Sequence, residues 1–493
     1  MVYYILYPIF TALIPIFTFY NKNLGEVAFK NIIKLILGAS ISVIALFFLL
    51  TKGFNISQNI SSGIILYLLI LFYTPDYIWK RFFSYYYYKY IIKYGFYAVL
   101  VFLLVYIDNI LPLIVTIITA LVLVLNIIYS LSNHNKGEIN INPEIIDFNN
   151  ISNDDKPDIY HIILDAYIGN TGIKAVSDFD NTEFYNDLRN LGFHVYENIY
   201  SNYNHTMASI PSLFTMDYIE YKNIPESQIK INRLKELIYS KTIFSLKNAG
   251  YTISAYSKWF FNETNSYISK NVIDKQITLT NTGTNETYYN FFKMTAFGVF
   301  LLKLKSNLSN AKYVIDSFDL FKDDMALNSP SYCFFHILAP HTPYSFHKDG
   351  TINNKYNEME LYENFQGEVA EAYFNHAFYT SKLSIKAFSN LIENIKKKNR
   401  KAVVFIHSDH GAEKTHINAT RYNIILAEYT FGYDNKPIFH NNMSLINVFP
   451  MIINYVFNAN IPLKEEKFYD EHPYSYTLTE ITDNIKQLLS GKS

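Results

Sequence analysis

The chain has 493 residues, half of them hydrophobic, and its 42 basic and 43 acidic side chains almost cancel. This balance, without any basic stripe, excludes a nucleic-acid-binding protein by composition. A single cysteine, Cys333, excludes an internal disulfide framework and any cysteine-based metal cluster.

Apolar residues are concentrated in residues 1–132, which we interpret as a transmembrane helical domain. We expect about five spans, over residues 3–20, 34–50, 62–75, 94–107 and 110–131. The last of these carries no charge and is long enough to cross a bilayer, which takes about 20 residues. No small-residue cleavage site follows the first span, so we do not expect a removable signal peptide. Five closely spaced segments favour a membrane domain over buried helices of a soluble domain.

The charges of two connecting loops bear on the orientation of this domain. Loop 21–33 contains Lys22 and Lys30. Loop 76–93 contains four basic residues: Lys80, Arg81, Lys89 and Lys93. With five spans, both loops lie on the same side of the membrane as the C-terminal domain. Because basic loops are usually cytoplasmic, loop charge alone places that domain in the cytoplasm.

The remaining chain is polar. Residues 133–157 are rich in Asn, Asp and Gly and are typical of a linker, which leaves residues 158–493 as the catalytic domain. In that domain we predict strands at "DIYHIIL", "TISAYS", "YCFFHIL", "AVVFI" and "YNIILAEY".

Helical patterns lie between these strands. They are "NTEFYNDLRNLGF", which stops at Gly192, "RLKELIYSKTIFSLKNAGY", which stops at Gly250, much of 362–398, and "SLINVFPMIINYVF". Strands that alternate with helices predict a three-layer α/β domain with a mostly parallel sheet.

Polar side chains follow three of the predicted strands. Asp165 ends the first, His336 and His341 lie at and beyond the end of another, and Asp409 and His410 follow "AVVFIHS". Ligands of open α/β sheets bind at the carboxyl ends of the strands. Two carboxylates and an imidazole suit a divalent cation of the zinc or manganese type. Because His336 has only apolar neighbours, we interpret it as a core histidine.

A stretch rich in small residues, 201–218, contains two candidate nucleophiles, Thr206 and Ser209. A divalent cation can bind such a hydroxyl and lower its pKa, which makes it a nucleophile at neutral pH. Each residue also has an ordinary interpretation: Asp165 as a helix cap, and Thr206 as a loop hydroxyl. We favour the functional interpretation for Asp409 and His410 together.

In chain order, Asp165, "TMASIP", "PHTPY" and "SDHG" resemble the alkaline phosphatase/sulfatase superfamily. Within it, the chain is similar to membrane-anchored sulfatase-like enzymes of the lipoteichoic acid synthase and phosphoethanolamine transferase type. The resemblance covers residues 157–460 and implies an alkaline-phosphatase-like catalytic domain outside the cytoplasmic (inner) membrane. We give this implication more weight than the loop charges.

The resemblance also implies roles for individual residues. It assigns four ligands to the metal: Asp165, Thr206, Asp409 and His410. The transferases usually have Glu where this chain has Asp165. Thr206 matches the nucleophile, and His341 matches a histidine that orients the substrate or leaving group. His416 and Arg421 follow the Asp-His-Gly turn and are candidates to meet an anionic headgroup.

One departure separates this chain from true sulfatases. Sulfatases mature a Cys or Ser within Cys/Ser-x-Pro-x-Arg, whereas this chain reads Ser209-Ile-Pro-Ser-Leu213, with leucine in place of arginine. Cys333 lies in a different predicted strand. We therefore expect phosphoryl chemistry rather than sulfate ester hydrolysis.

The expected function is the transfer of a phospholipid-derived phosphoryl headgroup, of phosphoethanolamine or phosphoglycerol type, onto an envelope glycan or glycolipid through a phosphothreonine. The phospholipid donor, the glycan acceptor and the membrane are the expected partners, and zinc or manganese is the expected cofactor. The alternative is a membrane-anchored phosphodiesterase or phosphatase with the same site and water as acceptor. A non-catalytic envelope protein is a third possibility, but a binding module has no need of a nucleophile among metal ligands.

Overall fold

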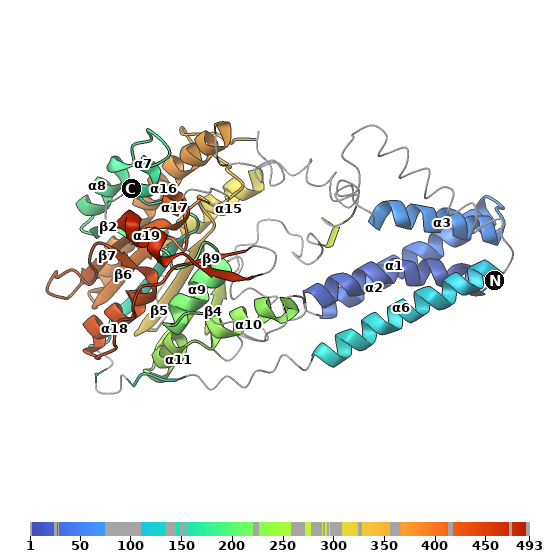
Figure 1. Ribbon diagram of the computed structural model, residues 1–493, viewed down its shortest axis with the longest axis horizontal. Helices are drawn as coiled ribbons and strands as arrows, with labels where there is room; N and C mark the ends of the chain where they lie inside the picture. Colours follow the sequence, from blue (N-terminus) through green and yellow to red (C-terminus); the bar gives the residue numbers. More distant parts are fainter. Residues whose placement is uncertain are drawn as a thin grey trace. The chain divides into compact units, whose positions relative to one another are not determined.

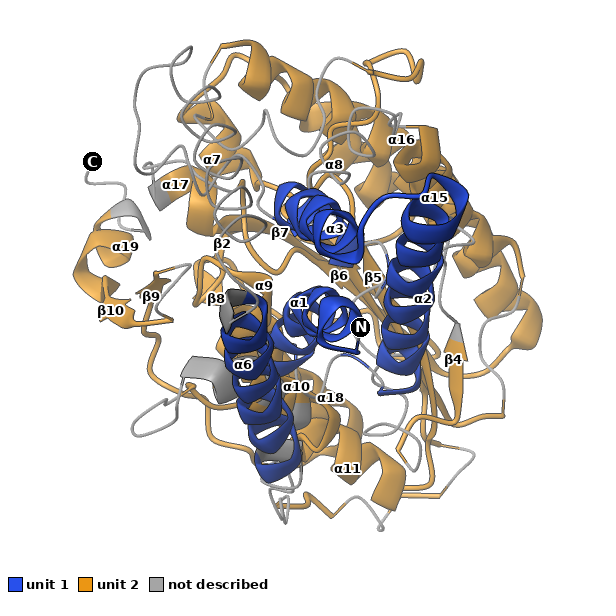
Figure 2. Cartoon of the chain, turned by 90° about the vertical axis from the view of Figure 1, so that its right-hand side faces the viewer, with its two compact units in different colours: residues 1–139, 282–304 blue, residues 140–281, 305–493 orange. Residues whose placement is uncertain are grey.

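The structure is a computed structural model, and the chain divides into two compact units (Figure 2). Unit 1 contains residues 1–139 and 282–304, and unit 2 contains residues 140–281 and 305–493. Residues 282–304 therefore group with the N-terminal helices, although they lie within the range 158–493. The structure describes residues 2–23, 27, 29–73, 110–134, 144–147, 151–152, 155–219, 226–257, 272–277, 288, 291–292, 295, 308–323, 328–354, 365, 367–412, 418–472 and 476–489.

Unit 1 is built from apolar helices. They are α1 (Val2–Lys22), α2 (Phe29–Phe48), its π-helical extension η1 (Leu49–Gly53), α3 (Gln58–Tyr73) and α6 (Ile110–His134). Among the described residues, three helical segments are long and apolar enough to cross a membrane: Val2–Asn21, Phe29–Gly53 and Pro112–Ser132. The apolar helix α3 is shorter. The expected span 94–107 and the basic loop 76–93 lie outside the described residues.

Unit 2 is built on an eight-stranded sheet with the order β4-β3-β5-β1-β6-β7-β2-β8. The strands are β1 (Asp158–Leu164), β2 (His194–Tyr200), β3 (Thr252–Ser257), β4 (Lys275–Ile277), β5 (Ser331–Ile337), β6 (Ala402–His407), β7 (Asn423–Phe431) and β8 (Met443–Ser444). β7 is antiparallel to both of its neighbours, and the other neighbouring pairs are parallel. The mostly parallel sheet predicted from the sequence is confirmed. β9 (Tyr469–Glu471) and β10 (Leu478–Glu480) form a separate antiparallel pair.

Helices cover both faces of the large sheet, and each face buries its own apolar cluster (Figure 1). One face carries α9 (Thr206–Thr215), α10 (Glu226–Ile238), α11 (Lys241–Asn248) and α18 (Val448–Phe457). The other carries α8 (Thr182–Asn190), α15 (Leu308–Asp319) and α16 (Glu368–Lys398). Shorter elements are α7 (Asn170–Lys174), α17 (Asn418–Tyr422), α19 (Thr482–Leu489) and the 3-10 turns η3 (Leu320–Lys322) and η4 (Leu445–Asn447). The predicted three-layer architecture is confirmed.

Two local features show how single residues set where a helix ends or begins. α8 is followed by Gly192, whose φ of +95° is in the left-handed region that favours glycine. The single helix predicted to stop at Gly250 is wrong, because the chain breaks into α10 and α11. At the break, the side chain of Ser240 caps α11 and accepts a hydrogen bond from the amide of Ile243.

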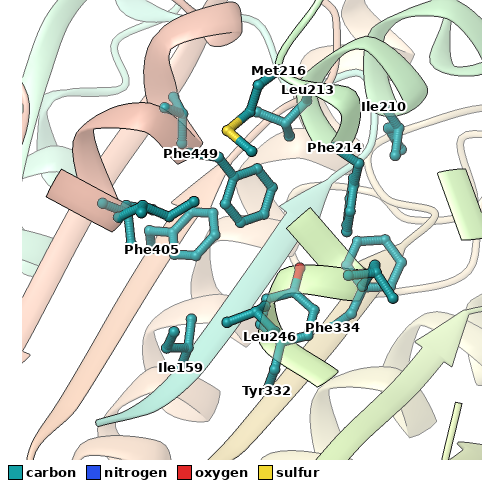
Figure 3. Packing of buried hydrophobic residues seen from close by; sticks show 14 of the residues in the cluster. Ile159, Ile210, Leu213, Phe214, Met216, Leu246, Tyr332, Phe334, Phe405 and Phe449 are labelled. Atoms are coloured by element: carbon teal, nitrogen blue, oxygen red, sulfur yellow. The ribbon is translucent and has the colours of Figure 1, made fainter. Parts of the chain in front are cut away.

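The apolar face of α9 is anchored on the sheet by aromatic packing (Figure 3). The ring of Phe214 lies 5.4 Å from that of Phe334 on β5 and 5.2 Å from that of Phe449 on α18, centroid to centroid. Phe214 is fully buried, and burying such a side chain stabilises a fold by roughly 1.5–3 kcal/mol. Its packing holds α9 in one place, and with it Thr206, the first residue of that helix.

Candidate active site

Three adjacent parallel strands carry the candidate ligands to one edge of the sheet. Ile163 on β1 is in register with His336 on β5 and with His407 on β6. Asp165 directly follows β1, and Asp409 lies two residues beyond β6. The carboxyl ends of these strands therefore bring together residues that are far apart in the sequence.

Asp165, His336 and Asp409 form the centre of a buried cluster. Each offers one ligand atom, and these atoms all lie within 4.8 Å of one another. His336 Nε2 is 3.0 Å from Asp165 Oδ2. His410 Nε2 is 3.8 Å from Asp165 Oδ1 and 3.5 Å from Asp409 Oδ2. The structure thus brings the predicted Asp165, Asp409 and His410 together.

His336 is the residue of this cluster that the sequence reasoning missed. Its apolar neighbours indicate a core histidine, and its side chain is indeed buried. It is also the penultimate residue of β5, so its ring reaches the edge where Asp165 lies. Aligning the two strand ends would have found it, because His336 and Asp165 each lie one residue from the last residue of their strand.

Two carboxylate oxygens of the cluster are buried without a hydrogen bond, although both lie within 4 Å of His410 Nε2. Asp165 Oδ1 and Asp409 Oδ2 make no hydrogen bond within the described part of the chain. Leaving a buried polar atom unsatisfied costs about 1–3 kcal/mol, and more when the group is charged. A divalent cation would satisfy both oxygens, so the donor set fits a metal ion.

The pKa values of the two carboxyls differ in direction. Burial and the nearby charge of Asp165 raise the pKa of Asp409. Burial acts in the same direction on Asp165, but the imidazoles of His341, His336 and His410 outweigh it and lower the pKa of Asp165. Like charges this close disfavour ionisation of both groups, which is a second reason why a cation suits the site.

The hydroxyl of Thr206 faces this cluster. Its Oγ1 lies 3.0 Å from His410 Nε2. His410 Nδ1 lies 2.7 Å from the carbonyl oxygen of Gly411. A carbonyl oxygen only accepts, so His410 Nδ1 carries a hydrogen and Nε2 is the ring nitrogen that faces Thr206. The position of Thr206 at the start of α9 also exposes its oxygen to the positive end of the helix dipole.

Ser209, the rival nucleophile, has a different environment. Its Oγ donates to the backbone carbonyl of Asp409 at 2.7 Å, and Ser201 Oγ donates to the same oxygen at 2.5 Å. The hydroxyl of Ser209 therefore supports the turn that carries Asp409. This arrangement favours Thr206 as the nucleophile.

Gly411 is required by the shape of the Asp-His-Gly turn. The amides of Gly411 and Ala412 donate to the carbonyls of Arg421 and Thr420, both at 2.8 Å. A Cβ at Gly411 would lie 1.9 Å from the Thr420 oxygen. Any side chain at this position would push apart the two segments that hold the turn.

The remaining candidates differ in their placement. His341 lies in the loop after β5, where its Nδ1 donates to the carbonyl of Thr342 at 2.8 Å, and its charge acts on Asp165. Arg421 pairs with Asp470 at 3.2 Å. His416 lies outside the described residues.

A comparison with protein families identifies the family of this chain. The model of the sulfatase family matches residues 173–470, more than half of the chain. The chain belongs to the sulfatase family. The match begins just after Asp165 and includes Thr206, Asp409 and His410, and it confirms the resemblance seen in the sequence. No curated protein sequence matches the chain.

Several solved structures are similar to this sulfatase-family chain. The C-terminal periplasmic domain of EptC from Escherichia coli is 14% identical, with 69% of this chain and 97% of that chain covered and a TM-score of 0.42. The lipoteichoic acid synthase LtaP from Listeria monocytogenes is 12% identical, with 69% and 90% covered and a TM-score of 0.39. The integral membrane lipooligosaccharide phosphoethanolamine transferase A from Neisseria meningitidis is 11% identical, with 89% and 77% covered and a TM-score of 0.41.

The cluster predicts a metal-dependent stability. Added Zn²⁺ should raise the thermal midpoint of the chelator-treated protein, because a ligand at 100 times its Kd stabilises the folded state by about 2.7 kcal/mol. Asp409→Asn should lose most of this response, since it removes one charged ligand. The exposed Asp434→Asn is the matched control and should respond as the wild type does. Equal responses of the two variants to Zn²⁺ in differential scanning fluorimetry would exclude this cluster as the metal site.

Proposed function

We propose that this protein is a metal-dependent transferase that moves a phospholipid-derived phosphoryl headgroup onto a cell-envelope glycan or glycolipid. One observation carries the proposal: the hydroxyl of Thr206 lies 3.0 Å from His410 Nε2, beside two buried carboxylates with unpartnered oxygens. A hydroxyl next to a cation site is the arrangement that phosphoryl transfer through a covalent intermediate needs.

The chain's own residues define where the cation would bind. Asp165, Asp409, His410 and Thr206 would hold it, and His336 lies within the same cluster. When bound, a zinc or manganese ion lowers the pKa of a hydroxyl and offsets negative charge on a phosphoryl group.

The reaction begins at Thr206. Thr206 gives its hydroxyl proton to water, its Oγ1 bonds to the phosphorus of the lipid phosphodiester, and the bond from phosphorus to the diacylglycerol oxygen breaks. His341 supplies or orients a proton at that leaving oxygen. The product is a phosphothreonine that carries the headgroup, of phosphoethanolamine or phosphoglycerol type. Because Thr206 starts α9, the phosphoryl group lies at a helix N-terminus, which favours anions.

A hydroxyl of the envelope glycan or glycolipid then displaces the threonine oxygen and restores Thr206. The spanning helices of unit 1 support a donor held in the bilayer, because they confine enzyme and lipid to the same surface. A soluble phosphatase gains nothing from them. The competing reaction is hydrolysis, in which water takes the place of the glycan at the same site.

Thr206→Ala should reduce turnover on the order of 10³-fold or more, because it removes the nucleophile. Thr206→Ser, which keeps a hydroxyl, should retain measurable activity. Intact-protein mass spectrometry should detect a covalent adduct on the wild type and none on Thr206→Ala, and the adduct mass identifies the headgroup. Full activity of Thr206→Ala together with loss in Ser209→Ala would reverse the assignment.

Transfer and hydrolysis are separated by supplying labelled phospholipid with and without envelope glycan. We expect label on the glycan with the wild type and not with Thr206→Ala, because transfer needs the phosphothreonine to outlast attack by water. Rapid release of the free phosphorylated headgroup, at a rate that the glycan does not change, would establish the phosphodiesterase instead.

The catalytic domain should lie outside the cytoplasmic membrane, because the proposed lipid donor and glycan acceptor meet there. An alkaline phosphatase reporter fused at the C-terminus should therefore be active in cells, and a fluorescent reporter that folds only in the cytoplasm should stay dark. The opposite pattern would agree with the basic loop 76–93 and would refute this location.

A further inference from the structure

Three polar side chains lie in an otherwise aromatic part of the core beneath the candidate site. They are Tyr332 on β5, His161 on β1 and His407 on β6, and none of them is exposed to solvent. Figure 3 shows Tyr332 in this layer, close to Phe334 and beneath α9. The ring of His161 stacks on Phe405 at 4.3 Å.

These three side chains form a continuous chain of hydrogen bonds that crosses three strands. The hydroxyl of Tyr332 is 2.8 Å from His161 Nδ1. His161 Nε2 is 2.7 Å from His407 Nε2. His407 Nδ1 is 2.9 Å from the carbonyl oxygen of Ser408. The hydrogen-bond chain therefore ends at Ser408, the first residue of the turn that carries Asp409 and His410.

The direction of this chain follows from its last acceptor. The carbonyl oxygen of Ser408 can only accept, so His407 Nδ1 must carry a hydrogen. Both rings are fully buried, and burial disfavours the charged imidazolium, so each ring carries a single hydrogen. His407 Nε2 then accepts from His161 Nε2, and His161 Nδ1 accepts from Tyr332. One carbonyl thus fixes the tautomers of two histidines.

The turn itself is held by further side-chain donors. The carbonyl of Asp409 accepts from Ser201 and Ser209, and the carbonyl of His410 accepts from Ser408 Oγ at 2.6 Å. Within the described part of the chain, the bond from His407 is the one that ties the carbonyl of Ser408 to the interior of the sheet. That carbonyl belongs to the peptide plane between Ser408 and Asp409, so its direction helps to set where Asp409 points.

We propose that Tyr332, His161 and His407 are positioning residues, whose hydrogen-bond chain orients the peptide before Asp409 and so presents Asp409 and His410 to the cation and to Thr206. None of the three touches the reacting atoms. The inference rests on the proposed metal site but not on the choice between transfer and hydrolysis. For packing alone, apolar side chains would serve as well in this aromatic layer.

The test uses the full-length protein in detergent and Zn²⁺ as the probe. The triple variant Tyr332→Phe/His161→Leu/His407→Leu removes the hydrogen-bond chain and leaves the carbonyl of Ser408 as its one unpaired member. Its thermal midpoint without metal should fall by no more than the loss of one buried hydrogen bond explains. Its Kd for Zn²⁺ should rise about 10–100-fold, as is usual when partners of metal ligands are lost. Tyr332→Phe alone removes the bond farthest from the turn and should have a smaller effect.

Tyr251→Phe is the matched control. Tyr251 is buried in the same apolar cluster, and its hydroxyl makes no hydrogen bond within the described part of the chain. This variant should keep the wild-type Kd for Zn²⁺. An unchanged Kd in the triple variant would overturn the positioning role and leave the proposed function standing. If the loss of folded-state stability, measured as a fall in thermal midpoint, explains the whole change in the Kd for Zn²⁺, the three side chains have only a structural role.

A second measurement holds even if the triple variant does not fold. ¹⁵N spectra of wild-type protein labelled only at histidine should show His161 protonated on Nε2 and His407 protonated on Nδ1, with signals assigned by the single His→Leu variants. A hydrogen on His407 Nε2 would overturn the inference. If the wild type binds no Zn²⁺, the metal site of the proposed function fails, and so does this positioning role.

Discussion

Two negative charges that the fold places together within its interior are the constraint on which the rest of the site depends. Asp165 and Asp409 are both fully buried at the edge of the sheet. Two like charges 4 Å apart repel by about 4 kcal/mol at an effective dielectric constant of 20. Three nearby imidazoles, of His336, His341 and His410, and the positive end of the α9 helix dipole offset this repulsion. A bound cation would complete that compensation.

Two different parts of the fold hold the site in place, the large sheet and helix α9. The sheet sets the carboxylates through the register of β5, β1 and β6, which are neighbours by backbone hydrogen bonds. Thr206, the proposed nucleophile, comes from α9, whose place is set by apolar packing of Phe214 and its neighbours. The hydroxyls of Ser201 and Ser209 join the two supports, because they donate to the carbonyl of Asp409. The carboxylates and the hydroxyl of Thr206 are therefore held in place by the fold itself.

The sequence alone predicted the polar residues that follow strand ends, but not the contacts that depend on how neighbouring strands are aligned. Asp165 and Asp409 could be predicted because each follows an apolar run that only a buried strand explains. β2 was missed because a bulge between Tyr196 and Ile199 breaks the alternation that marks a strand. His161 and His407 are separated by 246 positions, so their contact follows from strand order, which no local pattern encodes.

The grouping of residues 282–304 with the N-terminal helices means that neither unit is a continuous stretch of chain. The chain passes between the two units three times, so unit 1 is not complete until residue 304 has left the ribosome. Phe291 is buried among residues of unit 1, against Phe19 and Tyr73. A fragment that starts at residue 140, where unit 2 begins, would carry this phenylalanine away from its partners, so that fragment would expose an aromatic side chain that the whole protein covers.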